Sequence, residues 1–121
     1  MPWTIRYHQQ RPEKPQVGDM WPAPWLLETE GARRFFLTAA YERDQMAKRS
    51  PLVVRLPDGT DFCVDQPYSS AREKREGWQV TGEPPKLTLL PSINCAGSYH
   101  GWIRDGVITD DCEGRRFPSS G

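Results

Sequence analysis

Residue types that bind metals or transfer protons are concentrated between Pro91 and Gly114, namely Cys95, His100, Asp110, Asp111 and Cys112. An Asp-Gly pair in the same segment predicts a tight hairpin, which would bring its two arms together. With one further thiol upstream, three cysteines and one histidine match the ligand set of a structural zinc site. We therefore treat zinc as a candidate cofactor with the ligands Cys63, Cys95, His100 and Cys112. The alternative is that the thiols are small buried hydrophobes.

His100 also suggests a catalytic site, because an imidazole titrates near neutral pH and transfers protons readily. Asp110 or Asp111 would orient the ring across the hairpin. The candidate nucleophiles are Ser92, Ser98 and Cys95. The structural alternative is that His100 bonds a backbone carbonyl and fixes the turn.

The acidic residues after the hairpin allow another interpretation. Asp110, Asp111 and Glu113 form a cluster of carboxylates, which are ligands that hard cations prefer. Three carboxylates near a chain end are, however, more often solvated.

Composition and charge exclude several classes of protein. Lysine and arginine together number 16, as do aspartate and glutamate, so the net charge is zero and no strong nucleic-acid signal exists. No apolar run is long enough to cross a membrane, and the first residues lack a signal-peptide pattern. Three cysteines do not suggest a disulfide framework. We expect a cytoplasmic protein.

The length of 121 residues predicts a single domain spanning residues 1–121. We divide it into an extended arm rich in proline and tryptophan at 1–30, a compact core at 31–117 and a frayed tail at 118–121. Repeated prolines between residues 8 and 25 disfavour helix interiors and central strands. The arm nevertheless carries large apolar side chains, so we expect it to pack across the domain.

The core pattern predicts hairpins and one short helix. Residues 39–48 form the best helical segment, with Thr38 as its N-cap, after a short strand at 35–37. The hairpins pair 52–56 with 60–65, 77–81 with 86–90, and 101–103 with 107–109. Asp58-Gly59 favours a type I′ turn in the first hairpin. The expected fold is α+β, a small strand-dominated antiparallel sheet.

Several segments resemble a family of small uncharacterised proteins from tailed phages and prophages. The resemblance is carried by Pro91-Ser92-Ile93 and by Tyr99-His100-Gly101-Trp102-Ile103-Arg104-Asp105-Gly106, and it extends back through residues 77–88 and parts of 48–65. It implies a phage or prophage origin.

The carboxy-terminal half is also similar to a bacterial group of unknown function found in operons with ubiquitin-like conjugation enzymes. That group carries a serine-proline-serine segment, then a cysteine-serine-histidine and an aromatic-isoleucine hairpin, and the resemblance implies metal binding. This chain departs from the pattern at Gly97, where the group has its cysteine, and at Leu56-Pro57-Asp58-Gly59, where the group has a cysteine-rich turn.

Two functional hypotheses follow. The first is a phage or prophage accessory protein, a small interaction module with a host or phage protein as partner and with zinc as a structural stiffener. The alternative is a small hydrolase-like enzyme that uses His100 with Asp110 or Asp111. The sequence leaves the oligomeric state open.

Overall fold

The computed structural model describes residues 2–117, so the expected tail at 118–121 lies outside the described residues. The described residues form an α+β fold in which strands dominate, as predicted. In chain order the elements are β1 (Trp3–Thr4), β2 (Arg6–Tyr7), β3 (Asp19–Pro22), the 3₁₀ helix η1 (Pro24–Leu27), α1 (Glu30–Phe36), α2 (Ala39–Asp44), β4 (Leu52–Arg55), β5 (Asp61–Cys63), the 3₁₀ helix η2 (Ser69–Ala71), β6 (Gln79–Thr81), β7 (Thr88–Leu90), β8 (Ile93–Cys95), β9 (Tyr99–Gly101), β10 (Ile103–Arg104) and β11 (Val107–Ile108).

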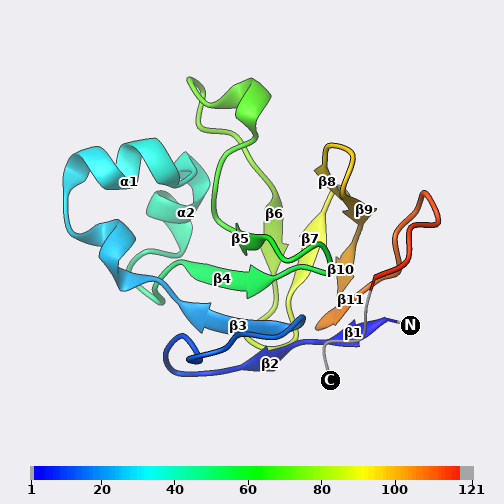
Figure 1. Cartoon of the computed structure of the whole chain (residues 1–121). Helices are drawn as coiled ribbons and strands as arrows, with labels where there is room; N and C mark the ends of the chain where they lie inside the picture. The colour runs from blue at the N-terminus through cyan, green and yellow to red at the C-terminus, as the bar shows by residue number, and fades with distance from the viewer. Residues whose placement is uncertain (1, 118–121) are drawn as a thin grey trace.

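The strands are grouped into small sheets rather than one continuous sheet. Among the described residues, one sheet has the order β2-β3-β4-β5, a second has the order β1-β11-β10, and β6-β7 and β8-β9 are separate two-stranded ribbons. Only the pairing of β2 with β3 is parallel within this part of the chain. Figure 1 shows the helices at one end of the molecule and the β8–β9 ribbon toward the other.

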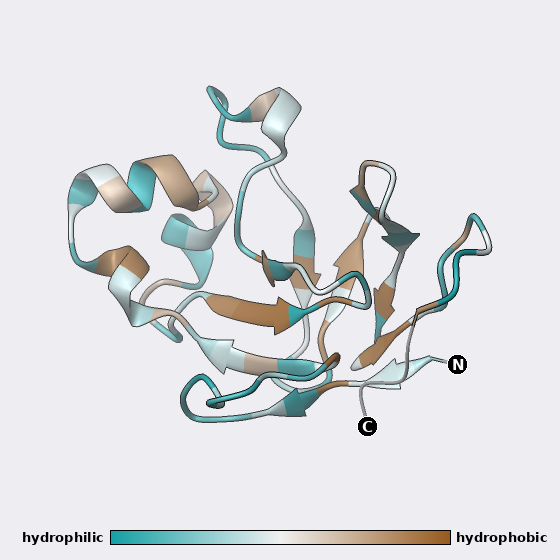
Figure 2. Ribbon diagram, in the orientation of Figure 1, coloured by the Kyte–Doolittle hydropathy of each residue, from teal (hydrophilic) through white to brown (hydrophobic). Residues whose placement is uncertain are grey.

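Two buried clusters hold these elements together. The larger lies between the sheets and is built on side chains that include Met20, Val54, Leu89, Tyr99 and Ile103. The smaller lies where the helices meet β3 and β4, and its buried members are Trp21, Ala23, Leu37, Tyr41, Val53 and Cys63. In Figure 2 the hydrophobic colour marks β4 strongly, whereas the segment that follows β11 is hydrophilic.

The helical region differs from the expectation in two respects. Thr38 caps α2 as predicted, because its hydroxyl oxygen accepts a hydrogen bond from the Tyr41 N–H at 3.0 Å. The helix ends at Asp44, however, and residues 45–48 form turns. The strand expected at 35–37 is wrong, since these residues end a second helix, α1, whose N-cap is Thr29. The described residues therefore hold two short α-helices and not one.

The proline-rich amino-terminal region supplies a central strand. β3 lies between β2 and β4, so the expectation that residues 8–25 avoid central strands is wrong for Asp19–Pro22. The physical reason is the position of the proline, which is the last residue of the strand, opposite Leu52. Met20 and Trp21 are almost fully buried, as the expected packing of the arm requires, whereas Trp25 is about half exposed.

The predicted hairpins are confirmed, but their turns differ. Asp105 and Gly106 both have positive φ, at 48° and 78°, as a type I′ turn demands. In the β4–β5 hairpin only Gly59 has positive φ, and the Gly59 N–H bonds the Leu56 carbonyl. Pro57 precedes the Asp-Gly pair and its ring fixes φ near −65°, so a type I′ turn does not form there.

Candidate active site

The β8–β9 ribbon positions the residues with chemical potential by strand alternation. Its register pairs Ile93 with Gly101, Asn94 with His100 and Cys95 with Tyr99. Ile93 and Tyr99 point into the large core, whereas Asn94 is exposed and His100 is part-exposed. Because successive side chains of a strand point to opposite faces, Ser92, Asn94 and His100 share the outer face. This placement brings Ser92 diagonally toward His100.

A serine and a histidine are in hydrogen-bond contact on this face. The Ser92 hydroxyl oxygen lies 3.1 Å from His100 Nε2. On the other side of the ring, Glu113 Oε2 lies 3.5 Å from His100 Nδ1. Trp102 stacks on the imidazole with an interplanar angle of 27°. The order hydroxyl, imidazole and carboxylate is the arrangement that activates a serine nucleophile.

Asp111 holds the histidine and the glutamate in this geometry. Its side chain is fully buried, and it accepts hydrogen bonds from the backbone N–H groups of His100 at 2.7 Å, Glu113 at 3.0 Å and Arg115 at 2.9 Å. The Arg115 guanidinium bonds the same carboxylate at 2.8 Å and lies 3.3 Å from Glu113 Oε2. Asp111 thus contacts the backbone of His100 and not its ring.

The environment of Asp111 favours its charged form. Burial opposes ionisation, but the N–H donors of Arg115 and His100 and the Arg115 charge outweigh it and lower the pKa of Asp111 below its ordinary value of 3.8. A negative charge at this position strengthens each of the hydrogen bonds that it accepts.

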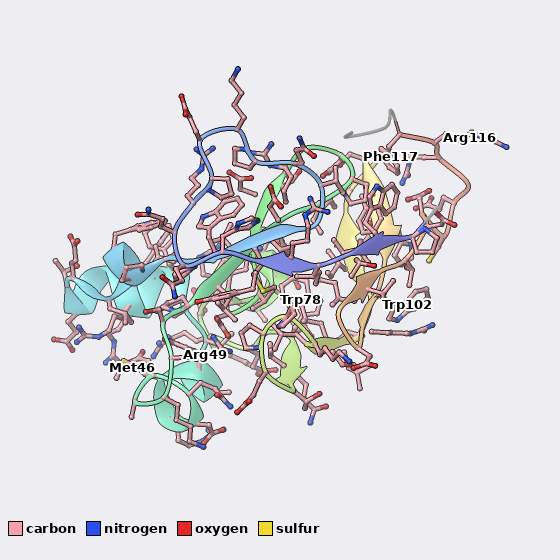
Figure 3. The ribbon with its side chains drawn as sticks, turned by 90° about the horizontal axis from the view of Figure 1, so that it is seen from below. Met46, Arg49, Trp78, Trp102, Arg116 and Phe117 are labelled. Carbon is pink, nitrogen blue, oxygen red and sulfur yellow. The ribbon has the colours of Figure 1, made fainter. Side chains whose placement is uncertain are left out.

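Two contacts from other elements fix the ribbon. Trp78 Nε1 donates a hydrogen bond to the Ser92 carbonyl at 3.2 Å. At the tip, the Ser98 hydroxyl donates to Asp58 Oδ2 at 2.7 Å and thereby ties β8–β9 to the β4–β5 turn. Figure 3 shows Trp78 near the middle of the molecule and Trp102 toward the end that carries Phe117.

Gly101 leaves room for the Tyr99 ring to cross the ribbon. A side-chain carbon built at Gly101 would collide with the Tyr99 hydroxyl and ring and would lie 2.8 Å from Thr109 Oγ1. The Tyr99 hydroxyl in turn donates to the Thr109 carbonyl at 2.8 Å. His100 lies between Tyr99 and Gly101 in the strand, so its backbone is fixed from both sides.

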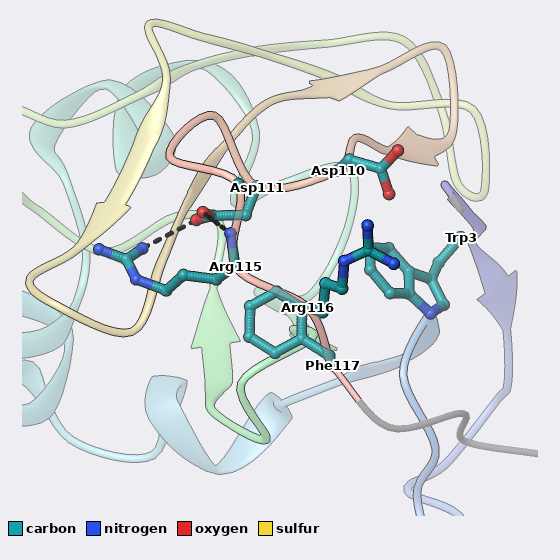
Figure 4. A pocket seen from close by; sticks show the side chains of 7 residues that line it. Trp3, Asp110, Asp111, Arg115, Arg116 and Phe117 are labelled. Carbon is teal, nitrogen blue, oxygen red and sulfur yellow. Dashed lines mark hydrogen bonds and ion pairs between the residues drawn. The ribbon is translucent and has the colours of Figure 1, made fainter.

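A pocket of about 450 Å³ adjoins the site without containing Ser92 or His100. Figure 4 shows Trp3, Arg116 and Phe117 around it, with Asp110 at one side and the Asp111–Arg115 ion pair at the other. The pocket and the site therefore share Asp111 and Arg115.

The serine and histidine of the ribbon lie inside the region that matches a known protein family. The model of a family described as the bacterial ubiquitination-like system serine protease, BubE, matches residues 39–110. The chain belongs to the BubE family. The matched region includes both Ser92 and His100 and ends before Asp111 and Glu113. Neither a curated protein nor a solved structure matches this chain.

The family corrects the first functional hypothesis. A phage or prophage accessory protein that acts as an interaction module is the wrong interpretation, because the BubE family is described as a serine protease. The resemblance to the bacterial group near ubiquitin-like conjugation operons agrees with this family, whereas nothing in the match links the chain to phages. The alternative hypothesis, a hydrolase that uses His100, agrees better with the finding.

The proposed zinc ligands are not brought together. Within residues 2–117, no group of three or more His, Cys, Asp or Glu side chains is arranged to hold a metal ion. Cys63 is buried in the small core cluster, whereas Cys95 packs against the large one and Cys112 is exposed. His100 faces Ser92 and Glu113 instead. The hard-cation interpretation of the acidic cluster likewise finds no such group in this part of the chain.

The sequence did not point to Glu113 as a partner of the imidazole. Asp110 and Asp111 were the expected partners, but Asp111 bonds the backbone and Asp110 lines the pocket. One signal was available, because Asp111 and Gly114 occupy the first and fourth positions of a turn, closed by the Gly114 N–H to the Asp111 carbonyl at 3.1 Å. Aspartate and glycine are favoured at these two positions. Glu113 is one of the two residues between them.

None of the helices within residues 2–117 has the length and apolar character that a bilayer span requires.

Proposed function

We propose that this chain is a serine protease in which Ser92 is the nucleophile and His100 is the general base. The observation that carries the proposal is the 3.1 Å contact between Ser92 Oγ and His100 Nε2, inside the region that matches the serine protease family. The family description further supports a polypeptide substrate that belongs to a ubiquitination-like system.

The chemistry follows from the order of the groups. The Ser92 oxygen attacks the carbonyl carbon of the scissile bond, and His100 Nε2 takes the hydroxyl proton. The same proton passes to the leaving amine as the C–N bond breaks, which leaves an acyl group on Ser92. Water, activated by the same imidazole, then hydrolyses the ester. Glu113 near Nδ1 favours the tautomer that has its proton on Nδ1, so Nε2 is free to accept.

The test is covalent labelling with a small fluorophosphonate, followed by intact-mass spectrometry and peptide mapping. We expect one phosphonyl group per chain on Ser92. Ser92→Ala should abolish the modification, and His100→Gln should slow it by about 100-fold or more, the usual contribution of a general base. Glu113→Gln should slow it less.

Ser98→Ala is the matched control, because Ser98 lies in the same ribbon but bonds Asp58. The control variant should still be modified on Ser92, and its rate should fall far less than that of His100→Gln. Modification of Ser98 in place of Ser92, or equal labelling of the His100→Gln variant and the wild type, would refute the proposal.

A further inference from the structure

Strand β8 has one open edge next to the nucleophile. Within residues 2–117 its only strand partner is β9. The far edge of β9 is occupied by the segment after β11, because the His100 N–H donates to Asp111 at 2.7 Å and the His100 carbonyl accepts from the Cys112 N–H at 2.6 Å. The ribbon can therefore accept another strand only along β8.

The bonds of His100 determine which groups line that edge. Both backbone groups of His100 point away from β8, toward Asp111 and Cys112. In an antiparallel ladder this makes His100 and its partner Asn94 a pair without mutual hydrogen bonds. The N–H and C=O of Asn94 consequently point away from β9, to the open edge. Asn94 is exposed, in keeping with this direction.

Trp78 marks where the open edge begins. Ser92 has the same strand parity as Asn94, and its carbonyl is already bonded by Trp78 Nε1 at 3.2 Å. Asn94 is thus the first residue after the nucleophile whose backbone groups are available. Two residues of extended chain separate it from Ser92, a distance of about 7 Å.

We propose that the Asn94 backbone binds the substrate as an added strand along β8 and so delivers the scissile carbonyl to Ser92. The inference rests on the proposed protease function. The ligand is an extended polypeptide segment, since only a chain with its own free N–H and C=O groups pairs with a strand edge. The Asn94 side chain takes no part in these bonds.

The experiment compares two Ser92-directed probes on the folded full-length chain. One is a small fluorophosphonate without a peptide, and the other is a tetra-alanine diphenyl phosphonate, which carries an extended backbone. Asn94→Pro removes the N–H at a position where no ladder bond is lost, so the strand tolerates it. Asn94→Ala is the matched control, because it alters the side chain and keeps the N–H.

We expect Asn94→Pro to slow the peptidyl probe by about tenfold, as the loss of one backbone hydrogen bond from the N–H requires, and to leave the small probe within about twofold. Asn94→Ala should label at wild-type rates with both probes. Equal rates of the peptidyl probe on Asn94→Pro and wild type would overturn the edge proposal while the protease proposal stands. No labelling of the wild type by the small probe would overturn both.

A second measurement uses the wild-type protein and so does not depend on the variant. Single N-methyl groups are placed in turn on each amide of the tetra-alanine probe. Slower labelling by about tenfold at one position supports strand pairing, whereas unchanged rates at every position overturn it.

Discussion

Asp65 follows strand β5 and Asp111 follows strand β11, and each buried carboxylate accepts hydrogen bonds from an arginine and from the backbone. Around Asp65 the partners are the Arg49 guanidinium, at 2.7 and 2.8 Å, and the Leu52 N–H at 3.1 Å. Around Asp111 they are Arg115 and three backbone N–H groups, one of which belongs to His100.

The difference lies in what each carboxylate connects. Asp65 joins the chain after α2 to the β4–β5 hairpin, and the Arg49 guanidinium also packs over the Tyr41 ring. Asp111 joins β9 to the turn that carries Glu113. The same chemical device thus holds the fold in one region and the geometry of the proposed catalytic site in the other. We expect substitution of Asp65 to affect mainly the free energy of unfolding, and substitution of Asp111 to affect mainly the labelling rate of Ser92.

The largest effect on stability is expected at the first of these carboxylates. Asp65→Asn removes the counter-ion of Arg49, whose side chain is only 16% exposed. The free energy of unfolding should fall by about 3 kcal/mol, because one charge of a buried pair is left uncompensated. Urea denaturation followed by tryptophan fluorescence measures the loss.

The control for this variant is Asp61→Asn, which breaks a pair with Arg55 at a carboxylate that is 38% exposed. An exposed ion pair contributes below about 1 kcal/mol. Equal losses in the two variants would contradict the structural role assigned to Asp65.

The largest effect on activity is expected at the second carboxylate. Asp111→Asn places an amide among N–H donors and loosens both His100 and Glu113. Fluorophosphonate labelling of Ser92 should slow by about 100-fold, as small displacements of catalytic groups do. Its loss of stability should be smaller than that of Asp65→Asn.

Asp110→Asn is the matched control, since it removes the same charge at the adjacent, exposed position. It should label at close to the wild-type rate. A slower rate for Asp110→Asn than for Asp111→Asn would return the orienting role to Asp110, as one sequence-based alternative had it.

Low pH should remove the difference in stability between the wild type and Asp111→Asn. The pKa of Asp111 is lowered in the folded protein, so the unfolded chain binds more protons and stability rises with pH. The contribution is complete above the unfolded-state value of 3.8 and is lost as the pH falls through the lower folded value. Urea midpoints of wild type and Asp111→Asn, measured from about pH 5 to 2.5, should therefore converge at the acid end. A constant gap would contradict the assignment.

The smallest effect expected concerns the thiols beside the two carboxylates. Burial, reinforced by the charge of Asp65, raises the pKa of Cys63 to about 12, whereas Cys112 is exposed next to Asp111. Iodoacetamide at neutral pH should alkylate Cys112 first and Cys63 last. Mass mapping of a time course gives the order. Asp65→Asn should speed the alkylation of Cys63, because the Asp65 charge contributes to the raised pKa of that thiol. Asp111→Asn should leave the rate at Cys63 unchanged.

Much of the fold was predictable from local sequence. Asp58-Gly59 and Asp105-Gly106 located two hairpins, and Thr38 located the start of α2, because turns and caps depend on neighbouring residues. β3 was missed because its pairing with β4 depends on contacts distant in sequence. Phe35 and Phe36 suggested a buried strand by hydrophobicity, yet both are exposed at the end of a helix.

The site was predictable only in part, because residue types can be read from the sequence but contacts between strands cannot. Ser92 and His100 were singled out as candidates by residue type alone, but their contact depends on the register of β8 with β9. That ribbon was not anticipated, since the expected hairpin began at Gly101. The role of Asp111 depends on its burial, which no pattern of charges indicates.

Gly101 sets a limit on how this protein can vary. It has no group to bind or react, yet any side chain there would displace the Tyr99 ring and, with it, the histidine between them. A lineage that diversifies the substrate would be free to change the exposed side chain of Asn94. It would have to keep the smallest residue at position 101, so the absence of a side chain there constrains the sequence as strictly as the proposed catalytic groups do.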